Sequence, residues 1–269
     1  MCNENEREFN FRNFWGSESK SMHLKFRRDR TTYCIYCGET ANTREHAPSR
    51  IFLYKPYPDN LIDLPACKKC NNSFSADELY SEVYIDSLKY LSGYSDSLTK
   101  ENNLRIYKTT AFYDAQCTFK QYIETGKIAL NNHLKRILTK LSICHCIYEL
   151  SEGYSTGDKT ISCESIEVYF RYNTRSDNIK EFLMPVMMND KILPELGSRV
   201  FDNIYVLEPV LSPVSGDEDK KIAFAIMLWT VVQENNYEYV AWIQDDKFHV
   251  KIAIHNFLFS HVVFKMDES

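Results

Sequence analysis

Four cysteines in two Cys-x-x-Cys pairs are the residues of this sequence with the clearest capacity for chemistry. The pairs are Cys34/Cys37 and Cys67/Cys70. Each such turn can place two thiolates on one ion, and a second turn completes a tetrahedron. Zinc is the usual occupant, and with four protein ligands it would be structural rather than catalytic. A redox dithiol and an iron–sulfur cluster are the alternatives that the spacing leaves open.

A Glu-His pair and two asparagines accompany the cysteines. Glu45-His46 and Asn60 lie between the pairs, and Asn71 follows Cys70 directly. A neutral imidazole can accept a proton near pH 7, and carboxylate and amide oxygens are ligands for hard divalent cations. Each residue also has a structural interpretation: a buried histidine, a glutamate paired with a neighbouring arginine, and a turn asparagine.

Taken together, residues 34–78 resemble the HNH, or His-Me finger, endonucleases of the type with two zinc knuckles. The resemblance rests on the cysteine pairs, Glu45-His46, the Asn-Leu pair at Asn60 and Asn71, in this order. It implies a zinc-stapled, treble-clef-like ββα finger with His46 as general base. It also implies that Glu45 and Asn71 hold one divalent ion, Mg²⁺ or Mn²⁺, and that Asn60 shapes the loop that aims His46.

The implied activity is metal-dependent hydrolysis of nucleic-acid phosphodiester bonds, with DNA rather than RNA as the expected substrate. By analogy, the resemblance also implies a role in bacterial or phage defence or restriction. The sequence has Glu45 where the family more often has Asp, and Asn71 where it often has His. These departures leave the identity of the ion open.

Ser75 and Glu78 follow Asn71 at helical spacing, so all three could share one face. Glu78 is therefore a candidate additional metal ligand, and Ser75 is a second residue that could join the metal site. The pattern Ser75-x-x-Glu78 also matches a capping box, which is the interpretation we favour.

Composition restricts the partners. The chain has 269 residues, 44% hydrophobic and 26% charged, which is typical of a globular protein. Its net charge of −5 excludes a wholly basic nucleic-acid binder. Residues 20–30 nevertheless carry clustered Lys and Arg, which fit either phosphate contacts or a solvated surface.

The remaining cysteines predict no disulfide framework, and the N-terminal residues lack an apolar signal core. The longest apolar run, residues 222–229, is too short to cross a bilayer. We therefore expect a cytoplasmic protein without a membrane partner.

The predicted architecture is α+β in three parts: a basic arm at 1–30, the finger at 31–95 and an α+β region for specificity or a partner at 96–269. The periodic patterns predict these elements: a helix over Leu79–Leu91 ending at Gly93, partly strand-like structure at 104–123, a helix at 126–150, and strands at 166–172, 203–211, 222–232, 239–244 and 249–255. Short turns between the last strands predict an antiparallel meander.

Other candidates receive structural interpretations. Cys144-His145-Cys146 would point in different directions on a helix, so core packing is expected for Cys144. The histidines of the strand-rich tail, His249, His255 and His261, match no known site, and Trp229 and Trp242 are expected in the core of the sheet.

Two rival functions remain. The knuckles and basic residues would equally serve a non-catalytic zinc module that binds nucleic acid or protein. A toxin or effector held inactive by a regulatory partner protein is the third hypothesis.

Overall fold

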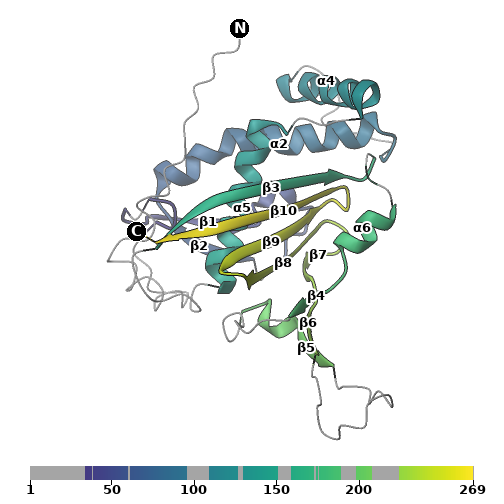
Figure 1. The fold of residues 1–269 in the computed structure, drawn as a ribbon. Coiled ribbons are helices and arrows are strands. Elements are labelled where there is room, and N and C mark those ends of the chain that lie inside the picture. Colours follow the sequence, from purple (N-terminus) through teal and green to yellow (C-terminus); the bar gives the residue numbers. More distant parts are fainter. Residues whose placement is uncertain are drawn as a thin grey trace, which may run out of the picture.

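A β-hairpin followed at once by a long helix begins the described part of the chain. The computed structural model describes residues 34–37, 39–59, 61–95, 109–126, 130–150, 159–172, 174, 176–188, 198–207 and 224–268. The basic cluster at 20–30 and Asn60 lie outside these ranges. Within them the chain is a mixed α+β structure, as predicted, with helices and an antiparallel sheet (Figure 1).

The hairpin consists of β1, Thr43–Ala47, and β2, Ile62–Ala66, which pair antiparallel over their full lengths. A single 3-10 turn, η3, Arg50–Phe52, lies between them. Helix α2, Lys68–Leu91, follows β2 after one residue. We call residues 34–95, which include the two cysteine pairs, the finger.

Helix α2 starts well before the first turn that periodicity predicted, near Leu79. Its N-cap residue is Cys67, whose sulfur accepts a hydrogen bond from the backbone N–H of Cys70 at 3.4 Å. The capping-box interpretation of Ser75-x-x-Glu78 is therefore wrong, because both residues lie inside the helix. The C-terminal end is as predicted, with Gly93 in the left-handed region at φ 72°.

Helix α4, Thr110–Thr125, contradicts the strand-like structure predicted for parts of residues 104–123. Aromatic side chains there favoured a strand. The buried Phe112 and Ala115 instead lie one helical turn apart, and α4 packs on α2 (Figure 1). The hydroxyl of Thr109 caps the first turn by accepting a hydrogen bond from the N–H of Phe112.

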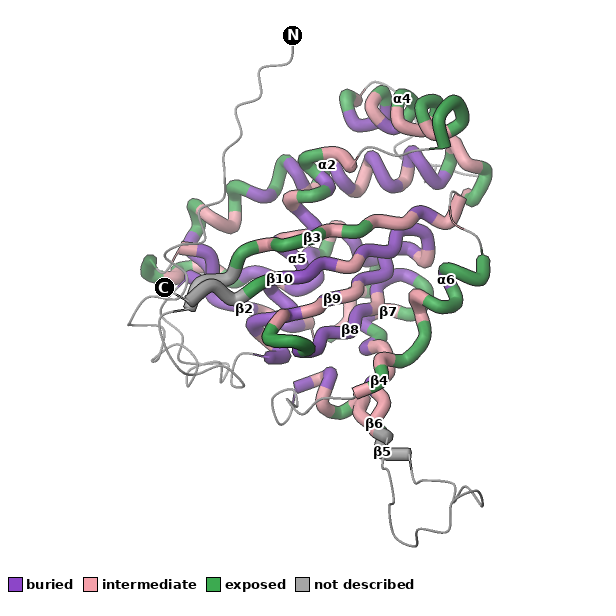
Figure 2. Tube along the Cα trace, in the orientation of Figure 1, coloured by how far each residue is buried: buried purple, intermediate pink, exposed green. Residues whose placement is uncertain are grey.

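Helix α5, Asn132–Leu150, lies at the centre of the structure and confirms the helix predicted for 126–150. It contacts α2 and the hairpin on one side and the C-terminal sheet on the other. Buried residues are therefore concentrated in α5 and in the central strands, whereas α4 and α6 carry many exposed residues (Figure 2). Cys144 and Cys146 are both buried, which confirms core packing for Cys144.

Most of α5 from Ile137 onward is buried, and polar side chains there need partners, because an unpaired buried polar group is costly. Nε2 of His145 lies 2.9 Å from the hydroxyl of Tyr237, and its ring stacks on Tyr239 at 3.7 Å. The Tyr239 hydroxyl donates in turn to the carboxylate of Glu149. Lys140, another buried polar residue of α5, contacts the finger, whereas the buried hydroxyl of Ser142 has no hydrogen-bond partner among the described residues.

Five antiparallel strands form the C-terminal sheet, in the order β3-β10-β9-β8-β7. Their bounds are β3, Lys159–Phe170; β7, Thr230–Gln233; β8, Tyr237–Gln244; β9, Lys247–Ile254; and β10, Leu258–Glu268. Strands β7 to β10 are neighbours in sequence and in space, so the predicted meander is confirmed. The last strand, β10, was not predicted; it follows a turn in which His255 and Asn256 have positive φ.

Alternate residues of these strands point to opposite faces of the sheet. One face, with Tyr237 and Tyr239, packs on α5. The register places Trp242 and His249 on the other face. Helix α6, Ser176–Phe182, covers part of that second face, where its Ile179 joins a small apolar cluster.

A second, small sheet has the order β4-β6-β5. Its strands are β4, Val186–Met188; β5, Ile204–Leu207, preceded by the 3-10 turn η5, Phe201–Asn203; and β6, Phe224–Met227. The single strand predicted for 222–232 is therefore two strands, β6 and β7, which belong to different sheets. Trp229 lies between them and is half-buried, whereas Trp242 is buried as predicted.

Turns of the C-terminal sheet bind the finger. The side chain of Gln233 makes two hydrogen bonds of 2.8 Å to the backbone of Tyr54, one to its N–H and one to its carbonyl. Nδ2 of Asn236 donates to the carbonyl of Phe52 at 3.1 Å. The finger and the sheet thus contribute to one hydrophobic core.

No helix in the described ranges is both long enough and apolar enough to cross a membrane.

Candidate functional site

The four cysteines of the two pairs converge on one point. Their sulfur atoms all lie within 4.8 Å of one another, and the Cys37 and Cys67 sulfurs are 3.7 Å apart. Four thiolates bound to one zinc ion at about 2.3 Å would be about 3.8 Å apart. The cluster therefore fits a structural zinc ion, as the sequence predicted. Four thiolates would fill all four coordination positions of the ion, so none is left for a substrate.

Backbone hydrogen bonds shape this cluster. The N–H of Tyr36 donates to the Cys34 sulfur, and the N–H of Cys70 donates to the Cys67 sulfur, each at 3.4 Å. Such N–H groups stabilise the negative charge of thiolate ligands. The N–H of Ile35 also donates to the carbonyl of Pro65 at 3.0 Å, which joins the first cysteine pair to β2. The cluster therefore fastens the loop before β1, the end of β2 and the start of α2 together.

The carboxylate of Glu45 is buried and points toward α5. Its Oε1 lies 2.8 Å from Nζ of Lys140, which also contacts the carboxylate of Glu78 and, at 2.8 Å, the hydroxyl of Ser49. The side chains of Lys140 and Glu45 are only 1% and 5% exposed. One buried ammonium is therefore shared by two carboxylates, and it joins β1, α2 and α5. We call Glu45, Glu78, Ser49 and Lys140 the lysine network.

Burial raises the pKa of Glu45, although the Lys140 ammonium opposes the shift. The nearby carboxylates raise the pKa of Lys140 even though burial opposes that rise. The Glu45 shift therefore follows from burial, and the Lys140 shift follows from attraction to the two carboxylates. The side chain of Tyr36 also hydrogen-bonds the Glu45 carboxylate and opposes the rise of its pKa.

His46 is the next residue of β1, so its side chain points to the opposite side of the strand. It is half-buried and lies opposite Asp63 of β2 in the hairpin register. Arg44 lies on the same side, two residues earlier, and its Nε is 3.5 Å from a carboxylate oxygen of Asp63. This side of the hairpin therefore presents an imidazole, a carboxylate and a guanidinium.

Burial, followed by the positive charge of Arg50, lowers the pKa of His46. The imidazole is therefore neutral at pH 7 and able to accept a proton. Its Nδ1 atom is buried and has no hydrogen-bond partner among the described residues. These properties suit a general base.

Asn71 lies in the first turn of α2 and connects the helix to β1. Its Nδ2 donates to the carbonyl of Arg44 at 3.0 Å and to the hydroxyl of Thr43 at 3.3 Å. Ser75 is exposed on the same helix. The position of Asn60, the fourth predicted site residue, lies outside the described residues.

Glu45 and Asn71, which the resemblance assigns to a catalytic ion, have other partners among the described residues. The only group of three or more histidines, cysteines and carboxylates that could bind an ion, among the residues described, is the cysteine cluster. Glu45 and Glu78 are held by Lys140, and the amide nitrogen of Asn71 is held by β1. We therefore assign no chemical step to a second metal ion.

Comparisons of the chain with protein-family models, with curated proteins and with solved structures found no significant match. The cysteine cluster indicates a zinc site, and no family is identified.

Two residues of this region were missed by the sequence analysis. Lys140 lies 95 residues from Glu45, so no local pattern connects the two. Asp63 belongs to an ordinary strand, and only the register of the hairpin places it opposite His46. The helical spacing of Lys140 within the apolar face of α5, one residue before Leu141, was the available signal.

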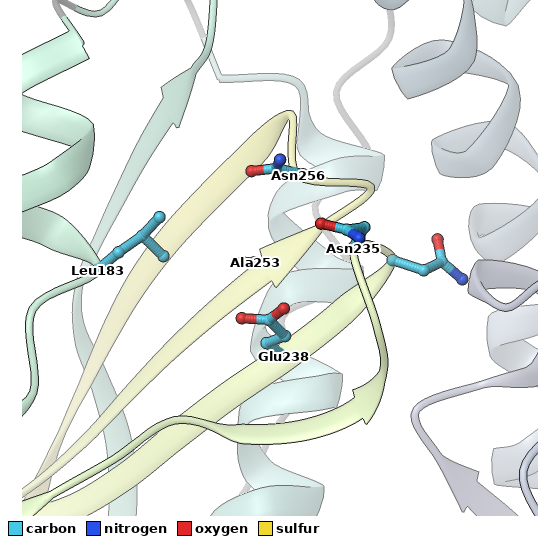
Figure 3. Close-up of a pocket in the computed structure, with 6 residues that line it drawn as sticks. Leu183, Asn235, Glu238, Ala253 and Asn256 are labelled. Carbon is cyan, nitrogen blue, oxygen red and sulfur yellow. The ribbon is translucent and has the colours of Figure 1, made fainter.

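A small hollow lies elsewhere, between the β7–β8 and β9–β10 turns. It is lined by Leu183, Asn235, Asn236, Glu238, Ala253 and Asn256 (Figure 3). Its volume of about 20 Å³ is far below that of typical ligand pockets. It contains no residue of the finger and has no evident role in the chemistry of His46.

Proposed function

We propose that this protein is an endonuclease that hydrolyses nucleic-acid phosphodiester bonds, DNA before RNA, with His46 as the general base. The observation that carries the proposal is the position of His46. It lies on a hairpin that a four-cysteine cluster fastens to a helix, and its imidazole is half-buried and neutral at pH 7.

In this mechanism the imidazole of His46 takes a proton from the attacking water. Asp63, opposite in the hairpin, stabilises the imidazolium that forms. The guanidinium groups of Arg44 and Arg50 supply donors for the phosphate oxygens. The requirement for Mg²⁺ or Mn²⁺ that the resemblance implies remains a prediction, as do a defence role and a regulatory partner protein.

A second candidate is a non-catalytic zinc module that binds nucleic acid or protein. The lysine network favours this alternative, because it occupies Glu45, which the resemblance assigns to the metal ion of the nuclease. In such a module, replacing His46 would leave the function unchanged.

The test is cleavage of supercoiled plasmid by zinc-loaded wild type, by His46→Ala and by His133→Ala. His133 is a matched control because it lies on α5, outside the hairpin, and is 49% exposed. Each protein is incubated with Mg²⁺, with Mn²⁺ and with a chelator, and its zinc content is measured afterwards. The proposal predicts nicking by wild type and His133→Ala, and none by His46→Ala with its fold and zinc intact.

Cleavage by His46→Ala at the wild-type rate would remove His46 as the base. Absence of cleavage by all three folded proteins, with plasmid binding unaffected by the substitution, would favour the binding module. Cleavage that survives the chelator while zinc is retained would contradict the predicted dependence on Mg²⁺ or Mn²⁺.

A further inference from the structure

Two histidines from neighbouring strands meet on the face of the C-terminal sheet opposite α5. His249 lies on β9 and His261 on β10, and Nδ1 of His249 is 3.1 Å from Nε2 of His261. In the register His249 faces Val263 and His261 faces Lys251, so the two histidines are diagonal neighbours. Their rings therefore lean toward each other across the strand pair.

We propose that His249 and His261 form a bidentate site for a divalent transition-metal ion such as Zn²⁺ or Ni²⁺, separate from the cysteine cluster. Metal–imidazole bonds of about 2.0–2.1 Å place two nitrogens of one ion roughly 2.9–3.4 Å apart, for bond angles between a right angle and a tetrahedral one. The observed 3.1 Å lies within this range. An ion bound to both nitrogens would lie off the line between them, so each ring would turn to direct its lone pair at the ion.

Both imidazoles are in the protonation state that a metal ion needs. Burial lowers the pKa of His249, and burial together with the neighbouring His249 lowers the pKa of His261 to about 4. Neutral rings keep a nitrogen lone pair at physiological pH. His249 also hydrogen-bonds the backbone carbonyl of Gln244, the kind of outer contact that sets the tautomer of a ligating histidine.

Charged groups face the pair from each adjoining strand. Glu167 of β3 lies opposite His261, and Lys251 lies on β9 beside both rings. The loop before β9 and strand β3 add Asp245 and Glu164, whose negative charges oppose that of Lys247. The Nζ of Lys251 donates to the carbonyl of Phe182 at 3.2 Å, lies 5.8 Å from the centroid of the Trp242 ring, and carries a positive charge that helps to lower the pKa of His261.

No third histidine, cysteine or carboxylate in the described ranges completes a three-ligand set with the pair. Water or an external ligand would therefore fill the remaining positions of the ion. Imidazole ligands select borderline ions such as Zn²⁺, Ni²⁺ and Cu²⁺ over Mg²⁺ and Ca²⁺. The site is thus distinct in chemistry from the hard-ion site of a metal-dependent nuclease.

Trp242 provides a direct reporter. Its ring lies nearly parallel to both imidazoles, with centroid distances of 5.0 Å to His249 and 5.5 Å to His261. A paramagnetic ion such as Ni²⁺ held by the pair would lie close to this indole and quench its fluorescence.

The experiment uses the full chain, free of any histidine tag, with the cysteine cluster already loaded with zinc. Ni²⁺ is titrated into wild type, His249→Gln, His261→Gln, Trp242→Phe and the control His133→Gln, at pH 7.5, and tryptophan fluorescence is recorded. The thermal midpoint is measured with and without Ni²⁺, because an ion that binds only the folded chain stabilises it.

We expect saturable one-to-one quenching in wild type and His133→Gln. Each substitution of the pair should weaken Ni²⁺ binding by more than the roughly 10–100-fold that loss of an outer contact costs. Trp242→Phe should lose the quenching but keep the thermal shift. Quenching that either single substitution leaves unchanged, or no saturable binding by folded wild type, would show that the pair is only an internal hydrogen bond.

Discussion

Replacement of Lys140 by Met tests whether the lysine network holds the finger on α5. Lys140 contacts Glu45, Glu78 and Ser49 through one buried ammonium. Met keeps most of the aliphatic stem but loses the ammonium, which also lies 5.2 Å from the centroid of the Phe74 ring. The substitution therefore removes the charge with little loss of packing.

We expect Lys140→Met to lower the free energy of unfolding by about 3–5 kcal/mol, the cost of leaving a buried charge without its partner. The triple variant Lys140→Met/Glu45→Gln/Glu78→Gln should recover most of this loss, because neutral groups of similar shape need no counter-charge. Lys120→Met is the control: the side chains of Lys120 and Glu124 are 77% and 60% exposed. Its effect should remain below about 0.5 kcal/mol.

The loss of unfolding free energy in Lys140→Met should also depend on pH. Burial already raises the pKa of Glu45, and removing the ammonium raises it further. The folded variant then binds a proton more tightly than the unfolded chain, so its stability is greatest at low pH and falls as pH rises through the folded-state pKa. The difference from wild type should therefore be smaller at pH 5 than at pH 8.

The assay is urea unfolding of zinc-loaded protein, followed by tryptophan fluorescence and far-UV circular dichroism at both pH values. A loss below about 1 kcal/mol, or an equal loss in the background that lacks both carboxylates, would refute the assignment of Lys140 as the shared counter-charge.

Four further predictions follow from other parts of the structure. Cys70→Ser should reduce bound zinc and unfold the finger, which metal analysis and the loss of cooperative melting would show, whereas the exposed Cys117→Ser should change neither. Burial lowers the pKa of His145 to about 3. The contribution of the neutral His145 to stability is therefore present above pH 6.5 and is lost as pH falls toward 3. His145→Gln should flatten the dependence of unfolding free energy on pH in this window by up to about 1.4 kcal/mol per pH unit. Gln233→Ala should cost about 1–3 kcal/mol in urea unfolding, because both of its bonds to the backbone of Tyr54 are lost, and an unchanged midpoint would contradict their role. If His46 is the base, the acid limb of kcat/KM should have an apparent pKa below 6.5, and a limb at or above 6.5 would contradict the lowering of the His46 pKa by burial and by Arg50.

Local patterns determined the parts of the structure that depend on short stretches of chain. Two Cys-x-x-Cys turns are sufficient to predict four thiolates on one ion, because each turn brings its own pair together. The C-terminal meander followed from alternating strands and short turns, since consecutive antiparallel strands pair through their own loops. Helix α5 followed from its periodic apolar face.

The alternation of side chains along a strand also bears on whether Glu45 and His46 can belong to one site. Adjacent residues of β1 point to opposite sides, so Glu45 and His46 diverge, and this was predictable once the strand was recognised. The strand pattern could not show which residue contacts the buried carboxylate of Glu45. That residue, Lys140, belongs to helix α5 and lies 95 residues after Glu45 in the sequence.

Local signals failed where neighbours in space decide the outcome. The aromatic residues of α4 have high strand propensity, and only packing against α2 makes them helical. His249 and His261 are unremarkable along the chain, and the register of β9 with β10 brings their nitrogens to 3.1 Å. The sequence by itself therefore predicted the zinc cluster, helices α2 and α5, the C-terminal meander and the candidate base. Tertiary structure alone decided the partner of each buried charge, because pairing between distant segments depends on packing that no local pattern records.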